Sequence, residues 1–194
     1  MKLIFLRHGL AGDRETWAGD DFDRPLTDAG KERMAREAAT LAKLNLNLDV
    51  ILTSPLVRAY QTAEIVAQRL NMTDKLVKDE RLSPGFRSNQ LAGILQAYPE
   101  AKALMLVGHE PDFSQLIGEL IGGGRIACKK GSLACVELNN ELNNELNNEN
   151  SGLGKERIGK ERSETMSNYL NNKSLHGELV WLIPPSVLAL AHVR

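Results

Sequence analysis

Two histidines in this chain each follow a short apolar run, and two arginines accompany them. Arg7 and His8 come directly after one such run, and His109 follows another. A third apolar run leads into a segment that carries Arg58. In open parallel sheets, ligands bind at the carboxyl ends of the strands. We therefore expect two imidazoles and two guanidiniums to converge at one sheet edge, where they can bind a small anion.

This set of side chains suits phosphoryl transfer. The reaction needs positive charge around the phosphoryl oxygens, an in-line nucleophile and help for the leaving group. Arg7 and Arg58 offer planar forks of donors that match phosphate oxygens, and a neutral His8 can attack phosphorus to form a covalent phosphohistidine. His109, protonated beside the phosphate, would stabilise the transferring group. Because the cations are side chains, this scheme requires no metal and no other cofactor.

A metal site at the same histidines is a competing interpretation. His8 and His109, together with Glu110 and Asp112, could supply metal ligands. The neighbouring arginines would repel a metal cation, so we favour the anion site. A regulatory module that binds phosphate without turnover is a second alternative, but such a module has no need of a nucleophile at His8.

The composition is that of an ordinary globular protein. The chain has 194 residues, of which 42% are hydrophobic and 25% charged, and a formal net charge of −1. This charge gives no reason to expect nucleic acid or an anionic membrane as a partner, and no apolar stretch is long enough to span a bilayer. Cys128 and Cys135 have no metal-ligand partners nearby, which suggests small buried thiols in a cytoplasmic protein.

Strand-like and helix-like segments alternate through the first two thirds of the chain. Thr27 is placed to cap one expected helix, and Pro55 suits the first position of the next. The alternation predicts an α/β fold, a single three-layer domain with a mostly parallel sheet and helices on both faces. The expected strands are 2–6, 49–53, 76–77, 104–107, 133–138 and 178–183, and the expected helices are 28–44, 55–70, 91–98 and 113–121.

A repeat-rich tract lies between the last two expected strands. Glu-Leu-Asn-Asn occurs three times over 137–148, and Gly-Lys-Glu-Arg occurs at 154–157 and at 159–162. The tract holds few large apolar side chains, so burial cannot offset the entropy of ordering it. We interpret 139–177 as a mobile, low-complexity insertion in a hairpin loop of a single domain that spans 1–194.

The polar segment 12–25 carries five acidic residues and two arginines. We interpret it as a solvated loop, and the alternative is that its carboxylates disfavour substrates with extra negative charge. Trp17 within it could touch the substrate or anchor its own loop.

The order of these motifs resembles the histidine phosphatase superfamily, which includes the cofactor-dependent phosphoglycerate mutases. The resemblance covers about 1–138 and 178–194. It is carried by Arg7-His8-Gly9, Leu26-Thr27-x-x-Gly30, Ser54-Pro55-Leu56-x-Arg58-Ala59-x-Gln61-Thr62-Ala63 and Gly108-His109. The small size, Gly108-His109-x-Pro111 and Trp181-Leu-Ile-Pro-Pro are most similar to the SixA-type phosphohistidine phosphatases.

The resemblance implies a phosphoglycerate mutase-like fold and a metal-independent phosphatase. His8 would be the nucleophile, and the phosphate would lie among Arg7, Gly9, Arg58 and His109. The favoured substrate would be a phosphohistidine on a protein, such as a histidine phosphotransfer domain in a signalling relay.

Glu80 is the candidate for the acid that protonates the leaving group. Larger relatives place a glutamate after the third strand, and Glu80 occupies a comparable stretch, although it could equally be a surface residue. An imidazole leaving group needs less acid assistance than an alkoxide.

Only 28 residues separate Glu80 from His109, which leaves no room for a lid domain. An open groove favours a phosphorylated protein, and a broad phosphomonoesterase acting on small phosphate esters is the alternative.

Overall fold

The structure, a computed structural model, describes residues 1–139 and 175–190. Its six strands are β1 (Lys2–Arg7), β2 (Val50–Thr53), β3 (Leu76–Lys78), β4 (Ala103–Gly108), β5 (Leu133–Leu138) and β6 (Gly177–Ile183). They form one sheet in the order β3-β2-β4-β1-β5-β6. The four strands from β3 to β1 are parallel, whereas β5 is antiparallel to both of its neighbours. The sheet is therefore mixed and mostly parallel, as expected.

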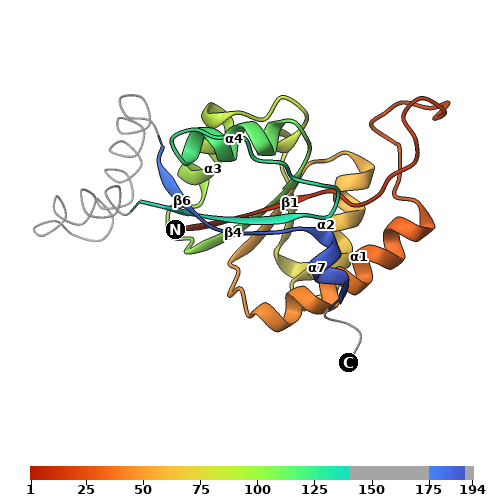
Figure 1. The fold of residues 1–194 in the computed structure, drawn as a ribbon, viewed down its shortest axis with the longest axis horizontal. Helices are drawn as coiled ribbons and strands as arrows, with labels where there is room; N and C mark the ends of the chain where they lie inside the picture. Colours follow the sequence, from red (N-terminus) through yellow and green to blue (C-terminus); the bar gives the residue numbers. More distant parts are fainter. Residues whose placement is uncertain (140–174, 191–194) are drawn as a thin grey trace, which may run out of the picture.

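Helices cover both faces of this sheet (Figure 1). They are α1 (Asp28–Leu41), α2 (Val57–Arg69), α3 (Ser88–Ala97), α4 (Asp112–Leu120) and α7 (Pro185–Leu190), and short 3-10 helices span Ala42–Leu44, Thr73–Lys75 and Glu80–Leu82. The helices α3 and α4 lie on one face, and α1, α2 and α7 lie on the other. This arrangement confirms the three-layer α/β fold.

Two apolar clusters, one on each face, fix the position of the sheet. Successive strand residues point to opposite faces, so Leu3 and Phe5 of β1 join the cluster under α3 and α4, whereas Ile4 and Leu6 join the other. Phe5 also meets Phe113 of α4 edge to face, with ring centroids 5.2 Å apart. The carboxyl end of β1 is therefore held from both sides.

The ends of the expected helices differ from those observed. Thr27 caps α1 as expected, because its hydroxyl oxygen accepts a hydrogen bond from the amide of Gly30 at 3.0 Å. The α-helix ends at Leu41, not at 44, since the chain tightens into a 3-10 helix and Asn45 then adopts the left-handed conformation. The next helix begins at Val57, two residues after the expected start.

The C-terminal helix α7 was not expected. Pro184 and Pro185 were interpreted as the end of the last strand, yet proline also suits the first position of a helix, and α7 begins at Pro185. Leu188 of this helix is buried in the cluster that α1 covers.

The strands β5 and β6 form the hairpin expected around the repeat tract. Leu138 pairs with Gly177, and the amide of Asn139 donates to the carbonyl of His176 at 3.0 Å. Most of the expected insertion, residues 140–174, lies outside the described residues. Within the described part, no helix is both long and apolar enough to cross a membrane.

Candidate active site

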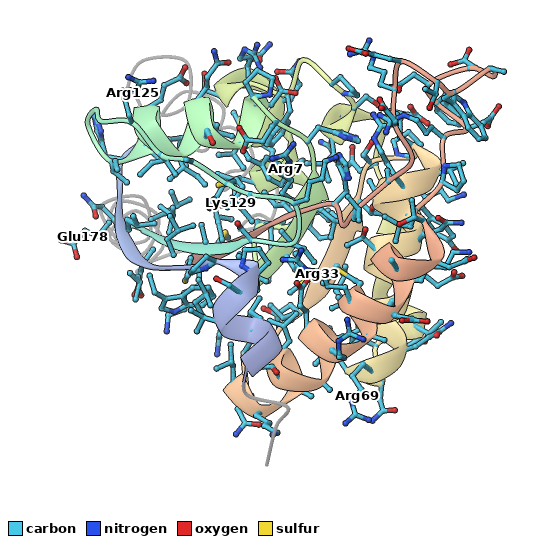
Figure 2. The ribbon with its side chains drawn as sticks, turned by 45° about the vertical axis from the view of Figure 1, so that its right-hand side comes forward. Arg7, Arg33, Arg69, Arg125, Lys129 and Glu178 are labelled. Carbon is cyan, nitrogen blue, oxygen red and sulfur yellow. The ribbon has the colours of Figure 1, made fainter. Side chains whose placement is uncertain are left out.

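The carboxyl ends of three adjacent parallel strands bring the predicted site residues together. Arg7 ends β1 and is followed by His8, while His109 follows β4, which lies next to β1 in the sheet. The amide of His8 donates to the carbonyl of Gly108 at 3.0 Å. Arg58 lies in the first turn of α2, just after β2. The strand ends therefore lie side by side as the sequence predicts, and Arg7, the last residue of β1, is labelled in Figure 2.

His8 is held in a form that can act as a nucleophile. Its Nδ1 lies 2.8 Å from the carbonyl oxygen of Gly9, and because a carbonyl only accepts, Nδ1 carries the proton of the neutral ring. The lone pair is then on Nε2. Burial, followed by the charge of His109, lowers the pKa of His8 well below 6.5. The ring is therefore neutral at neutral pH.

His109 lies beside His8, with the ring centroids 5.2 Å apart. Its Nε2 is 2.9 Å from the hydroxyl oxygen of Ser54, the residue after β2. Burial, followed by the charge of Arg58, lowers the pKa of His109 from 6.5 to about 4. In the free protein His109 is therefore neutral, and the protonated form expected beside phosphate requires the negative charge of a ligand.

Three nitrogen atoms at this site have no hydrogen-bond partner. They are Nε of Arg7, Nε of Arg58 and Nδ1 of His109, and they are the buried side-chain polar atoms of the described residues that lack a partner. Buried polar groups are nearly always paired, so unpaired groups that cluster in one place indicate a ligand site. All three belong to residues that the sequence assigns to phosphate binding.

The polar segment 12–25 contributes to the site a residue that the sequence interpretation missed. Asp21 accepts a hydrogen bond from Nη2 of Arg58 at 3.0 Å and another from Nε of Arg24 at 2.8 Å. Burial raises the pKa of Asp21, but the hydrogen bond from Arg24 and the charge of Arg58 outweigh it, so the net shift is downward. The interpretation as a merely solvated loop is wrong for Asp21, which orients Arg58. No spacing in the sequence marks this contact.

The exposed part of the same loop contains Trp17, whose indole Nε1 donates to the carbonyl of Asp20 at 2.8 Å. The observed contact therefore favours the interpretation that Trp17 anchors its own loop.

Gly9 has contacts that favour a positioning role. Its carbonyl accepts from His8, and its amide donates to the hydroxyl oxygen of Thr62 in α2 at 3.0 Å. Thr62 in turn donates to the carbonyl of Arg58 at 2.7 Å. The amide of Gly9 is thus engaged by the protein, and the phosphate contact expected of it would have to replace this bond.

Glu80 is not joined to the cluster of Arg7, His8, Arg58 and His109. It begins the 3-10 helix after β3, and its side chain is exposed. None of the hydrogen bonds or ion pairs found among the described residues links Glu80 to these four.

In the ranges 1–139 and 175–190, no group of three or more His, Cys, Asp or Glu side chains is arranged to hold a metal ion. Cys128 and Cys135 are both buried and free, as expected of small core residues.

Comparisons with known proteins agree with this geometry. Residues 3–85 match the model of the histidine phosphatase superfamily (branch 1). The chain is 44% identical over 117 residues to an uncharacterized protein of Picosynechococcus sp., which covers 59% of this chain and 70% of that protein. It is 29% identical over 125 residues to the phosphohistidine phosphatase SixA of Escherichia coli. This alignment covers 63% of this chain and 76% of that protein.

The fold has a close counterpart among solved structures. The protein histidine phosphatase SixA complexed with tungstate superposes with a TM-score of 0.71 and 22% identity, over 97% of this chain and 99% of that one. At this identity the superposition supports the fold alone, whereas the sequence matches establish the relationship. The chain therefore belongs to the histidine phosphatase superfamily, is similar to its SixA-type members, and is a phosphatase.

Proposed function

We propose that this phosphatase removes phosphate from protein phosphohistidine through a covalent phosphohistidine on His8, without a metal. The observation that carries the proposal is a buried, neutral His8 with its lone pair on Nε2, in a site where Nε of Arg7, Nε of Arg58 and Nδ1 of His109 have no hydrogen-bond partner. A relative that shares 29% identity is named a phosphohistidine phosphatase, which agrees with this substrate class.

The proposed reaction has two steps. Arg7, Arg58 and His109 bind the oxygens of the phosphoryl group, and Nε2 of His8 attacks phosphorus as the P–N bond to the substrate imidazole breaks. The substrate imidazole, already protonated on its other ring nitrogen when it binds, leaves as a neutral imidazole, and Nδ1 of His8 keeps its own proton. Water then attacks the phosphorus on His8, which releases inorganic phosphate and restores the neutral ring. Side-chain cations supply the positive charge that a metal supplies in other phosphatases.

The surroundings of the site support a protein substrate. Between residues 80 and 109, all of which the structure describes, most of the chain belongs to α3 and β4. The short loop before α3 is tied to α4, because the carboxylate of Asp112 accepts hydrogen bonds from the amides of Gly85 and Phe86 at 2.8 and 3.3 Å. This stretch therefore has no segment that could close as a lid over a small substrate.

Turnover by the EDTA-treated protein tests this function. The substrates are a phosphorylated histidine phosphotransfer domain, p-nitrophenyl phosphate and 3-phosphoglycerate. We expect rapid loss of the protein phosphate and little turnover of the two small esters. Strong activity on the small esters would instead indicate a broad phosphomonoesterase. Tungstate binding with no turnover of any substrate would indicate a regulatory binding module.

A variant series tests the nucleophile. His8→Ala should abolish turnover and the acid-labile labelling of the protein by radioactive phosphate, while its thermal unfolding stays cooperative. His176→Asn, in which an exposed histidine outside the site is replaced, is the matched control. Turnover retained by His8→Ala would remove His8 as the nucleophile.

A further inference from the structure

The loop that leads from α4 to β5 is fastened to the end of β1, beside the proposed nucleophile. The amide of Gly131 donates to the carbonyls of Arg7 and His8 at 3.1 and 3.2 Å, and the amide of Arg7 donates to the carbonyl of Ser132 at 3.2 Å. Nη1 of Arg7 donates in turn to the carbonyl of Cys128 at 2.8 Å. These bonds place the residues between Cys128 and Ser132 directly against the site.

Two lysines stand in this short segment, and they differ in their surroundings. Lys129 is exposed, whereas Lys130 is half-buried. Figure 2 marks Lys129 and Arg7, which come from this loop and from β1. Burial, followed by the charges of Arg7 and Arg24, lowers the pKa of Lys130, and Arg58 contributes in the same direction. The ammonium group of Lys130 is therefore within electrostatic range of the guanidiniums of Arg7 and Arg58 at the site, and of Arg24 in the loop 12–25.

No ion pair within 1–139 and 175–190 neutralises Lys130. Among the described residues, Asp21 pairs with both Arg24 and Arg58, and none of the other ion pairs includes Lys130. The charge of Asp13 raises the pKa of Lys130 without pairing with it. Repulsion between like charges in a partly buried site is unfavourable, and an anion with two negative charges would relieve it.

We propose that Lys130 is a catalytic residue that contacts the transferred phosphoryl group from the side of Arg7. The inference rests on the proposed function and adds Lys130 as a fourth side chain that contacts the phosphoryl group. Lysine supplies a compact charge with three rotatable donors, where the arginines supply fixed forks. Such a charge stabilises the equatorial oxygens in the transition state and selects for a fully ionised phosphoryl group.

Tungstate, an oxyanion without a leaving group, tests this contact. The variants are Lys130→Gln, Lys130→Arg and the matched control Lys129→Gln, assayed for tungstate inhibition and for kcat/KM on the substrates used above. We expect Lys130→Gln to weaken tungstate inhibition and to lower kcat/KM, each by about tenfold to a hundredfold, as for a lost charge-assisted hydrogen bond. Lys130→Arg should restore most of both, and Lys129→Gln should match the wild type.

Thermal unfolding separates a lost contact from a lost fold. Because the cations around Lys130 repel it, Lys130→Gln should raise the Tm of the free protein and reduce the increase in Tm that tungstate produces. An unchanged tungstate inhibition constant in Lys130→Gln would overturn the proposal, even with a raised KM, because Lys130 would then contact another part of the substrate. If the wild type binds tungstate but turns over no substrate, the proposed function fails, and tungstate affinity still decides whether Lys130 binds the oxyanion.

Discussion

Two buried neutral histidines should make this protein sensitive to acid. The pKa of His109 is about 4 in the folded state, against an ordinary value of 6.5, so the unfolded chain binds more protons between these values. The stabilisation of the folded state that comes from His109 is therefore fully present above pH 6.5 and is lost as the pH falls toward 4. Acidification from about pH 7 to about pH 5 should lower the free energy of unfolding by about 2 kcal/mol through His109 alone. His8, whose pKa is also lowered, acts in the same direction.

Urea titrations at these two pH values measure the effect. We expect the wild type to lose stability on acidification, and His109→Asn to reduce that loss by about 2 kcal/mol. Gln68→Ala, at an exposed position of α2, is the control and should keep the wild-type difference. If His109→Asn loses as much stability as the wild type, the reasoning is refuted, because the acid sensitivity must then arise from other groups.

Two further predictions concern residues outside the cluster of Arg7, His8, Arg58 and His109. Glu80→Gln should lower kcat/KM on the phosphorylated phosphotransfer domain by less than about threefold. The loss of a general acid lowers kcat/KM by about a hundredfold or more. A decrease of that larger size would assign the acid role to Glu80. Replacing residues 140–174 with a short Asn-Gly turn should preserve Tm and turnover, because β5 and β6 already pair up to the residues that flank this segment. A drop in either would show that the replaced segment supports the core or the site.

The four residues of the cluster could be predicted because each lies close to a strand end. An apolar run followed by a polar residue marks such an end, and parallel strands bring their carboxyl ends to one edge. Asp21 and Lys130 could not be predicted in this way. Asp21 reaches Arg58, 37 positions further along the chain, through the path of a loop, and Lys130 is positioned by the backbone bonds of its neighbour Gly131. Loop paths depend on tertiary contacts that no local pattern encodes.

The fold shows the same division. The alternation of strands and helices predicted the layers, since periodicity reports which face of an element is buried. It did not predict α7, because Pro184 and Pro185 suit the end of a strand and the start of a helix equally well. Packing decides between them: Leu188 is buried against the sheet, and its carbonyl accepts a hydrogen bond from Thr40 of α1 at 2.8 Å.

Acid sensitivity and reactivity have the same physical origin in this site. In the proposed reaction His8 must be neutral to attack phosphorus, and burial beside His109 and the guanidiniums of Arg7 and Arg58 keeps it neutral. In the same proposal these guanidiniums attract the phosphoryl group, so positive charge would both suppress protonation of the nucleophile and bind its target. A bound phosphoryl group would offset that charge, and His109 would then take up a proton that the free site opposes. The stability lost in acid is thus, in part, the thermodynamic cost of holding His8 unprotonated before the substrate arrives.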